Sequence, residues 1–599
     1  MLAWTLCLCI AATAIHYGMQ LRRWAWDSTT DVRFVNSPSN AIEWGSQANK
    51  VGVLKIYDEL VQQHGPEGDY SGPARFALDY APLRLFIASQ WADWAQRNFP
   101  PPESQPLVWQ PQYEFTAPML QLNMACELLA SFGMFLCVYH WIRVTRISPP
   151  QRWWTFSLKN AWGRDELPTG SLPSTVGLFT AMTAAMLLWF NPAVIFNAHV
   201  YPQWDVWLLP PFIFAMYFGM RNWWLPAGIA IGVCAMAKGQ ILFALPLIIA
   251  WPLLLGNLAG VARVLVGLIV GIAVVVWPFL LQSYDASRWI VFASVGAVLL
   301  SGAAAMPRSG WKWHFARATL ASIAIGVILW PVAGITGEYI MNGTEFVVHK
   351  RVILLSMLAL AAIAAVIGGR RWVPTLLAGV PAVCTLLTIP LLNASSAWFE
   401  VGTIYPTRHW KELYWCHGAN LGSLLQVRFQ WKYPDFVDLS KIPLLNLTEP
   451  VLLRNLMTVI YVILLGLLLL ALIRHRRWHD PKLLLVLAVP FMLSYTFLPQ
   501  MIERYLMWPA AILSAYAAIS LGGLVLWLSI SLIACALMFG YMLGMARNTP
   551  MAREWLPLVQ PLFPDIAWAI IALALVMLYM AFTPTRPPTA KAVLPLESK

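Results

Sequence analysis

The chain has few charged residues. Only 11% of its 599 residues are charged and 59% are hydrophobic, whereas an ordinary soluble domain is about 25% charged. This balance excludes a soluble globular protein and predicts an integral membrane protein. Lys and Arg outnumber Asp and Glu by 40 to 28, but they form no basic stripe apart from the apolar segments. A positive-inside topology accounts for them, and nucleic acid is not an expected partner.

Motifs for disulfides and metal ions are also missing. Of the eight cysteines, only Cys416 falls in an expected loop, and no CxxC spacing occurs. The sequence therefore contains neither a disulfide framework nor a cysteine metal site. It also lacks an acidic cluster with the spacing of an octahedral magnesium or manganese site. No metal or other cofactor is required on these grounds.

Long apolar runs, in contrast, fill most of the chain. They predict an all-α polytopic protein with about 14–16 transmembrane helices. The first run is expected to be a retained helix, because it lacks a basic start and a small-residue cleavage site. We assign residues 1–545 to one transmembrane domain, and residues 546–599 to a last outer loop, a terminal helix and a cytoplasmic tail. The expected spans lie near 2–19, 117–141, 174–195, 204–220, 223–237, 240–256, 264–281, 289–306, 317–335, 352–368, 372–391, 452–472, 481–498, 505–521, 523–545 and 565–583.

The short loops predict the orientation. With a cytoplasmic N-terminus, "RVTRISPPQRWW", "PRSGWKWHFAR", "GGRRW" and "RHRRWHDPK" lie inside, and "NAHVYPQWD", which has no Lys or Arg, lies outside. Arg22 and Arg23 argue the other way, but we assign them to a long loop, and long loops escape the rule. Two segments, 20–116 and 393–451, are too long to be simple connections. Both fall on the outer side and are expected to form an ordered cap with interfacial helices.

The first long segment contains two expected helices. The turn "NSPSN" is a plausible cap for a helix over about 41–51, on which Glu43 and Gln47 share a face. A second helix, in "PLRLFIASQWADW", is expected to lie in the membrane interface. Its apolar face consists of Leu83, Phe86, Ile87, Trp91 and Trp94. The acids of this segment, which include Asp31, Glu43 and Asp79, then stand just above the membrane.

Further polar residues are expected on the same side. His199, Gln203 and Asp205 lie in a short turn, where polar groups need water or a cavity. Lys238 and Gln240 lie between the next two spans, and Arg408 and His409 belong to the second long segment. This gathering of cations and carboxylates suits a substrate that is both anionic and lipid-anchored. Glu127, inside a span, is compatible with a proton or ion path and equally with a structural hydrogen bond.

Four ordered pieces resemble the GT-C superfamily of membrane glycosyltransferases. "LDYAPLRL" is similar to the "LDYPPL" segment of the glucosyltransferases that extend the N-glycan precursor. "NPAVIFNAHVYPQWDVWLL" resembles an "NP…GQxD" turn, with Pro202 where Gly is usual, and "AMAKGQILFALPLI" resembles the "K…P" pair that follows it. "MIERYLMWPAAIL" is similar to the "MHERYLxPAL" of GPI-like mannosyltransferases, with Ile502 where His is frequent. Together these pieces extend from about residue 30 to 515.

The resemblance implies transfer of a sugar from a polyprenyl-phosphate donor, with inversion at the sugar carbon. An acid of the first outer loop would act as general base, and cations would bind the departing phosphate. The usual Asp position falls at about Asn40, so Glu43 or Asp31 would replace it. Arg504 is the favoured phosphate ligand, held by Glu503. The remaining substrate-binding candidates are Tyr505, Asp79, Tyr80, Arg84, Gln203, Asp205, Lys238, Arg408 and His409.

The resulting hypothesis is a hexosyltransferase, with mannose as the expected sugar, that acts on the outer face of a bacterial inner membrane or of the endoplasmic reticulum. Its partners would be the lipid-linked donor, a glycan, lipid or protein acceptor, and membrane lipid. A lipid or glycan transporter is one alternative, although no internal repeat is visible. A catalytically inactive assembly subunit is another, because Asn40 cannot act as a base.

Overall fold

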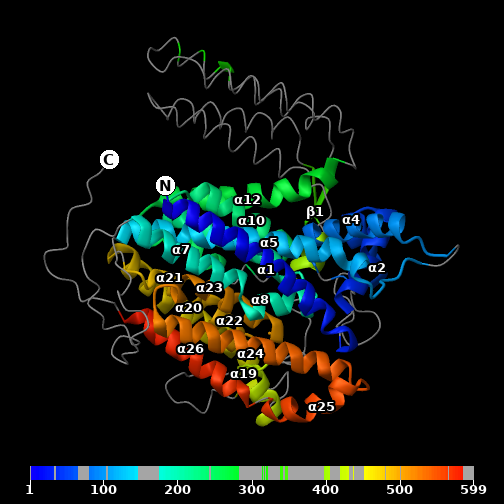
Figure 1. The fold of residues 1–599 in the computed structure, drawn as a ribbon. Helices are drawn as coiled ribbons and strands as arrows, with labels where there is room; N and C mark the ends of the chain where they lie inside the picture. Colours follow the sequence, from blue (N-terminus) through cyan, green and yellow to red (C-terminus); the bar gives the residue numbers. More distant parts are fainter. Residues whose placement is uncertain are drawn as a thin grey trace.

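The structure is a computed structural model and is predominantly helical, as the sequence predicts (Figure 1). Two short antiparallel pairs, β1 (Glu338–Met341) with β2 (Thr344–Val347) and β3 (Phe436–Val437) with β4 (Val451–Leu452), are the strands among the described residues. The structure describes residues 2–32, 36–64, 78, 80–102, 106–145, 174–239, 241, 244–281, 313, 316, 319–320, 338–341, 344–347, 397–404, 418–430, 436–437, 451–478, 480–499, 501–563 and 565–583.

Long apolar helices form the framework. Within the described residues, five helical segments are long and apolar enough to cross a membrane, or six if a pair bent by 55° counts as one span. The chain is therefore a multi-pass membrane protein. The five segments belong to α1 (Leu2–Asp27), α5 (Tyr113–Thr145), α7 (Ser174–Trp189) with its continuation to Val200, α20 (Leu453–Trp478) and α24 (Leu521–Met545).

Further helices occupy most of the other expected spans. Those near 289–306, 352–368 and 372–391, and most of 317–335, lie outside the described residues, so the predicted helix number stays a prediction. These further helices are α9 (Leu209–Met220), α10 (Trp224–Ala237), α11 (Leu245–Leu254), α12 (Leu258–Leu281), α21 (Leu483–Val486), α22 (Val489–Phe497), α23 (Met507–Ala517), α25 (Pro550–Val559) and α26 (Ile566–Phe582).

Irregular turns that carry polar residues connect several of the apolar helices. After α7 come α8 (Pro192–Ile195), the π-helical turn η2 (Phe196–Val200) and the 3₁₀ turn η3 (Asp205–Leu208), which leads into α9. Another 3₁₀ turn, η9 (Glu503–Leu506), precedes α23. Non-helical backbone at membrane depth needs internal partners. These turns are therefore the places where polar side chains can be held inside the bundle.

The glycines of α10 and α12 let these two helices lie in close contact. A Cβ added at Gly232 would lie 2.3 Å from the carbonyl oxygen of Leu268, and one at Gly271 would lie 2.3 Å from that of Ile229. Side chains at these positions would separate the backbones, as at other small-residue helix contacts in membranes. Because α10 ends directly before Lys238, this contact also supports the position of that lysine.

The first long segment forms a helical cap at one end of the bundle. Its helices are α2 (Asn36–Val51), α3 (Lys55–His64) and α4 (Pro82–Asn98), with a 3₁₀ turn η1 (Thr30–Val32) before them. The helix that we expected over 41–51 in fact begins at Asn36, so "NSPSN" is its first turn rather than a preceding cap. α2 and α4 lie at the end of the molecule opposite the start of α1 (Figure 1).

The second long segment is described only in part. Its described pieces include α17 (Ala397–Phe399), η6 (Glu400–Ile404), α19 (Leu421–Ser423) and the π-helical turn η7 (Leu424–Arg428). Asn420 caps α19, since its side-chain oxygen accepts from Ser423 N at 3.0 Å. The Asn420 amide also donates to the carbonyl oxygens of Tyr495 and Leu498 at 3.0 and 3.2 Å. It thereby fastens this segment to the end of α22.

Candidate functional site

Charged residues from three distant parts of the chain meet in one buried cluster. Asp205 begins η3, Lys238 follows the last residue of α10, and Arg504 lies in η9. All three side chains are at most one-tenth exposed. We call these residues, together with Arg84, Glu503 and the aromatic residues around them, the polar cluster. The aromatic residues are Tyr80, Tyr201, Trp204, Tyr505 and Trp508.

Asp205 is the centre of the polar cluster. One carboxylate oxygen is paired with the Lys238 ammonium, and the other lies 2.9 Å from Nε of Arg504. The indole nitrogen of Trp508 donates to the Asp205 backbone carbonyl at 3.1 Å. A buried carboxylate requires this kind of compensation. Asp205 therefore fixes both cations, which are separated by 266 positions in the sequence.

The surroundings change the acid–base properties of the two cations. Burial lowers the pKa of Lys238 to about 7; the charges of Arg504 and Arg84 also lower it, and Asp205 only partly opposes this shift. For Arg504, burial lowers the pKa, but Asp205 and nearby tyrosines outweigh that effect and raise the pKa above its usual range. Arg504 is thus a permanent cation, whereas Lys238 can change its charge near neutral pH.

Aromatic rings surround the cations. The Lys238 ammonium lies 4.1 Å from the centre of the Tyr505 ring, which stacks on Trp508 at 4.7 Å. The Arg84 guanidinium lies between Tyr80 and Trp204, 3.5 Å from each ring centre. Such stacking compensates a cation that has left water. Arg84 is 2% exposed and therefore depends on this environment.

The second acid of the polar cluster is Glu503. It is completely buried, and its carboxylate accepts a hydrogen bond from the Tyr201 hydroxyl at 3.0 Å. Tyr201 also contacts the ring of Tyr541 on α24, with ring centres 6.1 Å apart. The formal charge of the polar cluster is therefore three cations against two carboxylates, or +1.

Gln203 lies beside the polar cluster and joins it to the cap. Its side-chain amide is within hydrogen-bond distance of the Ser37 hydroxyl on α2, at 2.8 and 3.0 Å. The amide of Asn123 on α5 donates to the Gln203 carbonyl at 2.9 Å. Trp207 donates to the Asn123 side-chain oxygen at 2.6 Å. The turn that carries Asp205 is thus held from two sides.

The structure brings together most of the predicted substrate-binding residues: Tyr80, Arg84, Gln203, Asp205, Lys238, Glu503, Arg504 and Tyr505. Asp79, Arg408 and His409 lie outside the described residues. The two predicted bases do not belong to the polar cluster, because Glu43 lies on the exposed face of α2 and Asp31 on the exposed side of η1. Arg504 was expected to be held by Glu503, but its carboxylate partner is Asp205.

Sequence reasoning missed several residues that complete the polar cluster. Trp204 directly precedes Asp205, Trp508 follows Arg504 by one helical turn, and Tyr201 lies in the same turn as Gln203. Their aromatic character was not a usable signal in a chain in which 13% of residues are aromatic. Ser37 and Asn123 were also missed, since each is one of many small polar residues and its importance depends only on its partner.

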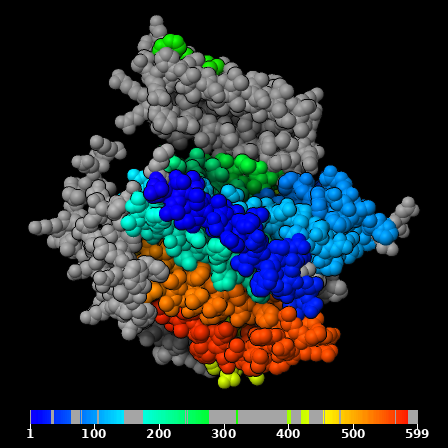
Figure 2. Space-filling model, viewed as in Figure 1, coloured from blue at the N-terminus to red at the C-terminus, as the bar shows by residue number. Residues whose placement is uncertain are grey.

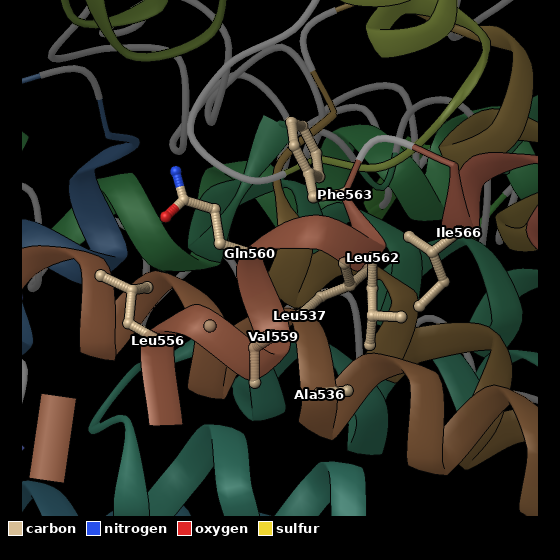
Figure 3. Close-up of a pocket in the computed structure, with 9 residues that line it drawn as sticks. Ala536, Leu537, Leu556, Val559, Gln560, Leu562, Phe563 and Ile566 are labelled. Atoms are coloured by element: carbon tan, nitrogen blue, oxygen red, sulfur yellow. The ribbon is translucent and has the colours of Figure 1, made fainter. Parts of the chain in front are cut away.

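A separate apolar pocket lies between α24, α25 and the start of α26, with the 3₁₀ turn η10 (Gln560–Leu562) at its side (Figure 3). It encloses about 370 Å³, part of which is open to the surroundings. Within the described part of the chain, no group of three His, Cys, Asp or Glu side chains is arranged to hold a metal ion. The lining of the pocket is mainly apolar, whereas the polar cluster consists of charged and aromatic residues.

Comparisons of the chain with protein-family models, with curated proteins and with solved structures found no match.

Proposed function

We propose that the chain is a membrane glycosyltransferase that transfers a hexose, with mannose as the first choice, from a polyprenyl-phosphate-linked donor to an acceptor hydroxyl on the extracytoplasmic face. The observation that carries the proposal is the polar cluster. The four sequence pieces with a resemblance to GT-C enzymes are distant in the chain, yet Arg84, Asp205, Lys238 and Arg504, one from each piece, meet in it.

The chemistry of the polar cluster suits a phosphate group. Arg84 and Arg504 present guanidinium groups, which match the oxygens of a phosphate, and Lys238 adds a compact charge. The excess positive charge and the low-polarity surroundings would stabilise the negative charge that develops on the leaving phosphate. Asp205 keeps these cations in place before the donor binds.

The acceptor hydroxyl needs a base within about 2.6–3.2 Å of its proton. We retain Glu43 and Asp31 as the candidates, since both are exposed and thus accessible to an acceptor. In the proposed step, the carboxylate takes the hydroxyl proton and the acceptor oxygen bonds to the sugar carbon. The bond from that carbon to the phosphate breaks, and polyprenyl phosphate leaves.

Purified protein in detergent tests the proposal with a polyprenyl-phosphate-mannose donor and a panel of acceptors. We expect sugar transfer by the wild type, and a loss of donor affinity of about 10- to 100-fold in Arg504→Gln, because a hydrogen bond to a charged group contributes about 1.5–3 kcal/mol. Arg547→Gln is the matched control, since Arg547 is an exposed arginine that donates to the Gly544 carbonyl at the end of its own helix at 3.0 Å.

The remaining outcomes separate the alternatives. Loss of transfer in Glu43→Gln or in Asp31→Asn identifies the base. Donor binding without any transfer, unchanged in both variants, would indicate an inactive assembly subunit. Movement of intact lipid between the two leaflets of a vesicle would indicate a transporter. Absence of both donor binding and transfer in the wild type would refute the proposal.

A further inference from the structure

A second buried ionic group lies within the membrane-spanning helices. Glu127 on α5 is completely buried, and its carboxylate accepts a hydrogen bond from Nε of Arg22 at 2.6 Å. Its other oxygen lies 2.9 Å from Nε2 of His199. Arg22 and His199 are 2% and 3% exposed. We call Arg22, Glu127 and His199 the ionic triad.

Arg22 is held by more than its carboxylate partner. Its guanidinium donates to the Trp189 carbonyl at 2.7 Å and lies 3.5 Å from the centre of the Trp189 ring. The Trp189 carbonyl needs this donor, because the backbone N–H of Ala193, its ordinary helical partner, bonds the side chain of Asn191 instead. Arg22 thus completes the end of α7 and neutralises Glu127 at once.

The ionic triad leads directly to the turn of the polar cluster. His199 belongs to the π-helical turn η2, and the chain reaches Gln203 and Asp205 within six residues. Asn123, one helical turn before Glu127 on the same face of α5, donates to the carbonyl oxygens of Ala198 and Gln203, each at 2.9 Å. The same face of α5 therefore holds the turn through Glu127 and through Asn123.

We infer that Arg22, Glu127 and His199 are positioning residues of the candidate site: the ionic triad holds the π-helical turn so that Gln203 and Asp205 enter the polar cluster. Burial of two charges and an imidazole is costly, and an apolar substitute often gives equal stability. A π-helical turn, in contrast, is a rare backbone form that is frequent at functional sites, and the ionic triad gives this one fixed side-chain partners. The effect on a lipid substrate rests on the proposed function, but the positioning itself does not.

Hydrogen exchange of the purified protein in detergent tests the positioning. The amides of Tyr201, Gln203 and Trp207 are hydrogen-bonded and report on the turn. In Arg22→Gln and Glu127→Gln we expect exchange over residues 196–208 to rise by about tenfold or more, with α20 and α24 unchanged. Arg23→Gln, a change of the neighbouring exposed arginine, should leave exchange over 196–208 unaltered.

Two further sets of variants guard against simple misfolding. The double variant Arg22→Gln/Glu127→Gln leaves no unpaired buried charge and should exchange more slowly than either single variant. His199→Gln keeps a donor for Glu127 and should preserve protection, whereas His199→Leu should lose it. Unchanged exchange over 196–208 in all single variants, or a uniform rise over the whole chain, would overturn the inference.

Lipid binding then connects the ionic triad to the site. With a polyprenyl phosphodiester as the probe, Glu127→Gln should bind several-fold more weakly than the wild type at a temperature well below unfolding. If the wild type binds no such lipid but the exchange results hold, the proposed function fails and the positioning role stands. If the wild type and Glu127→Gln bind equally, the connection to the site is refuted.

Discussion

The acid–base chemistry of Lys238 depends on its neighbours. It is 3% exposed, paired with Asp205 and placed against Tyr505. Burial first, and then the charges of Arg504 and Arg84, bring its pKa from 10.5 to about 7. Lysine on a surface stays charged throughout the physiological range. At this position it becomes a group whose charge depends on ordinary pH.

We expect donor affinity to fall as pH rises through about 7, because the Lys238 ammonium is protonated below this pKa and neutral above it. A polyprenyl phosphodiester is the suitable probe, since it carries one negative charge over the whole range. Binding should be measured from about pH 6 to about pH 9. Lys238→Met should bind weakly without this pH step. A step that persists in Lys238→Met would assign it to another group.

The environment of Arg22 decides whether its charge counts in the predicted membrane orientation. As a residue near the end of an apolar run, it counted in the sequence as a loop charge that opposed the predicted orientation. In the structure it lies inside α1, buried against Glu127. Only Arg23 is exposed, paired with Asp27 at 3.0 Å. A buried, neutralised arginine carries no weight in a positive-inside count.

At the scale of elements, the contact between α10 and α12 illustrates how helix packing supports the polar cluster. Four glycines, at 228, 232, 267 and 271, face the partner backbone, and added Cβ atoms would lie 2.1–2.3 Å from carbonyl oxygens. Lys238 follows α10 immediately, so any shift of this helix moves the lysine relative to Asp205. The packing of these glycines is therefore coupled to the position of Lys238.

We expect Gly232→Val to lower the melting temperature, because overpacking at a close contact costs about 1–3 kcal/mol. Gly466→Ala on α20 is the matched control. Nothing lies within 4 Å of a Cβ at that position, and alanine is favoured over glycine in a helix by about 1 kcal/mol. Thermal unfolding in one detergent compares the two variants. Equal stability of Gly232→Val and the wild type would contradict the close contact.

At the scale of the whole molecule, the two ends of the bundle differ. The cap helices α2 and α4 and the helix α25 lie at one end, and the start of α1 lies at the other (Figure 1). In Figure 2, α1 lies along the surface of the molecule. Large apolar side chains of this helix, such as Leu8 and Trp24, are about two-thirds exposed. This face suits contact with lipid.

Basic residues that the sequence places on the cytoplasmic side also connect helices in the structure. The stretch "RHRRWHDPK", expected as an inside loop, begins within the last turns of α20, which ends at Trp478. Arg474 donates to the Phe582 carbonyl at 3.1 Å and Lys482 to the Thr583 carbonyl at 2.7 Å. Arg476 donates to the Met220 carbonyl at 2.9 Å. These cations complete the ends of α26 and α9, where helix carbonyls lack partners. The cations at the end of α20 and after it thus join helices that are distant in sequence.

Asn420 makes the connection between the second long segment and the helical bundle. We expect Asn420→Ala to cost about 1–2 kcal/mol, since it removes a helix cap and the amide donor to Tyr495 and Leu498. Faster proteolysis and exchange over residues 418–430 would report the detachment. Asn98→Ala, at an exposed end of α4, should leave this segment unchanged. Unaltered protection in Asn420→Ala would show that other contacts suffice.

The sequence by itself determined the class of protein, the helical fold and the approximate position of each span that the structure describes. Transfer of side chains from water to lipid is roughly additive, so composition and run length suffice for these features. It also singled out Arg84, Asp205, Lys238 and Arg504, because charged residues between apolar runs are conspicuous. The start of α2 and the π-helical and 3₁₀ form of the turn predicted after residue 195 were beyond it, because tertiary partners set local turns.

Only the tertiary structure decided which charges meet. Arg22 pairs with Glu127, and Asp205 with Arg504, across separations of 105 and 299 positions. The candidate bases Glu43 and Asp31 carry the same carboxyl group as the buried acids Asp205 and Glu503, and the sequence assigned all four to the outer side. Yet Glu43 and Asp31 face outward. The energy of an ionic contact depends on distance and on the surrounding dielectric. Both are properties of the packed helices, so no local pattern of residues could specify them.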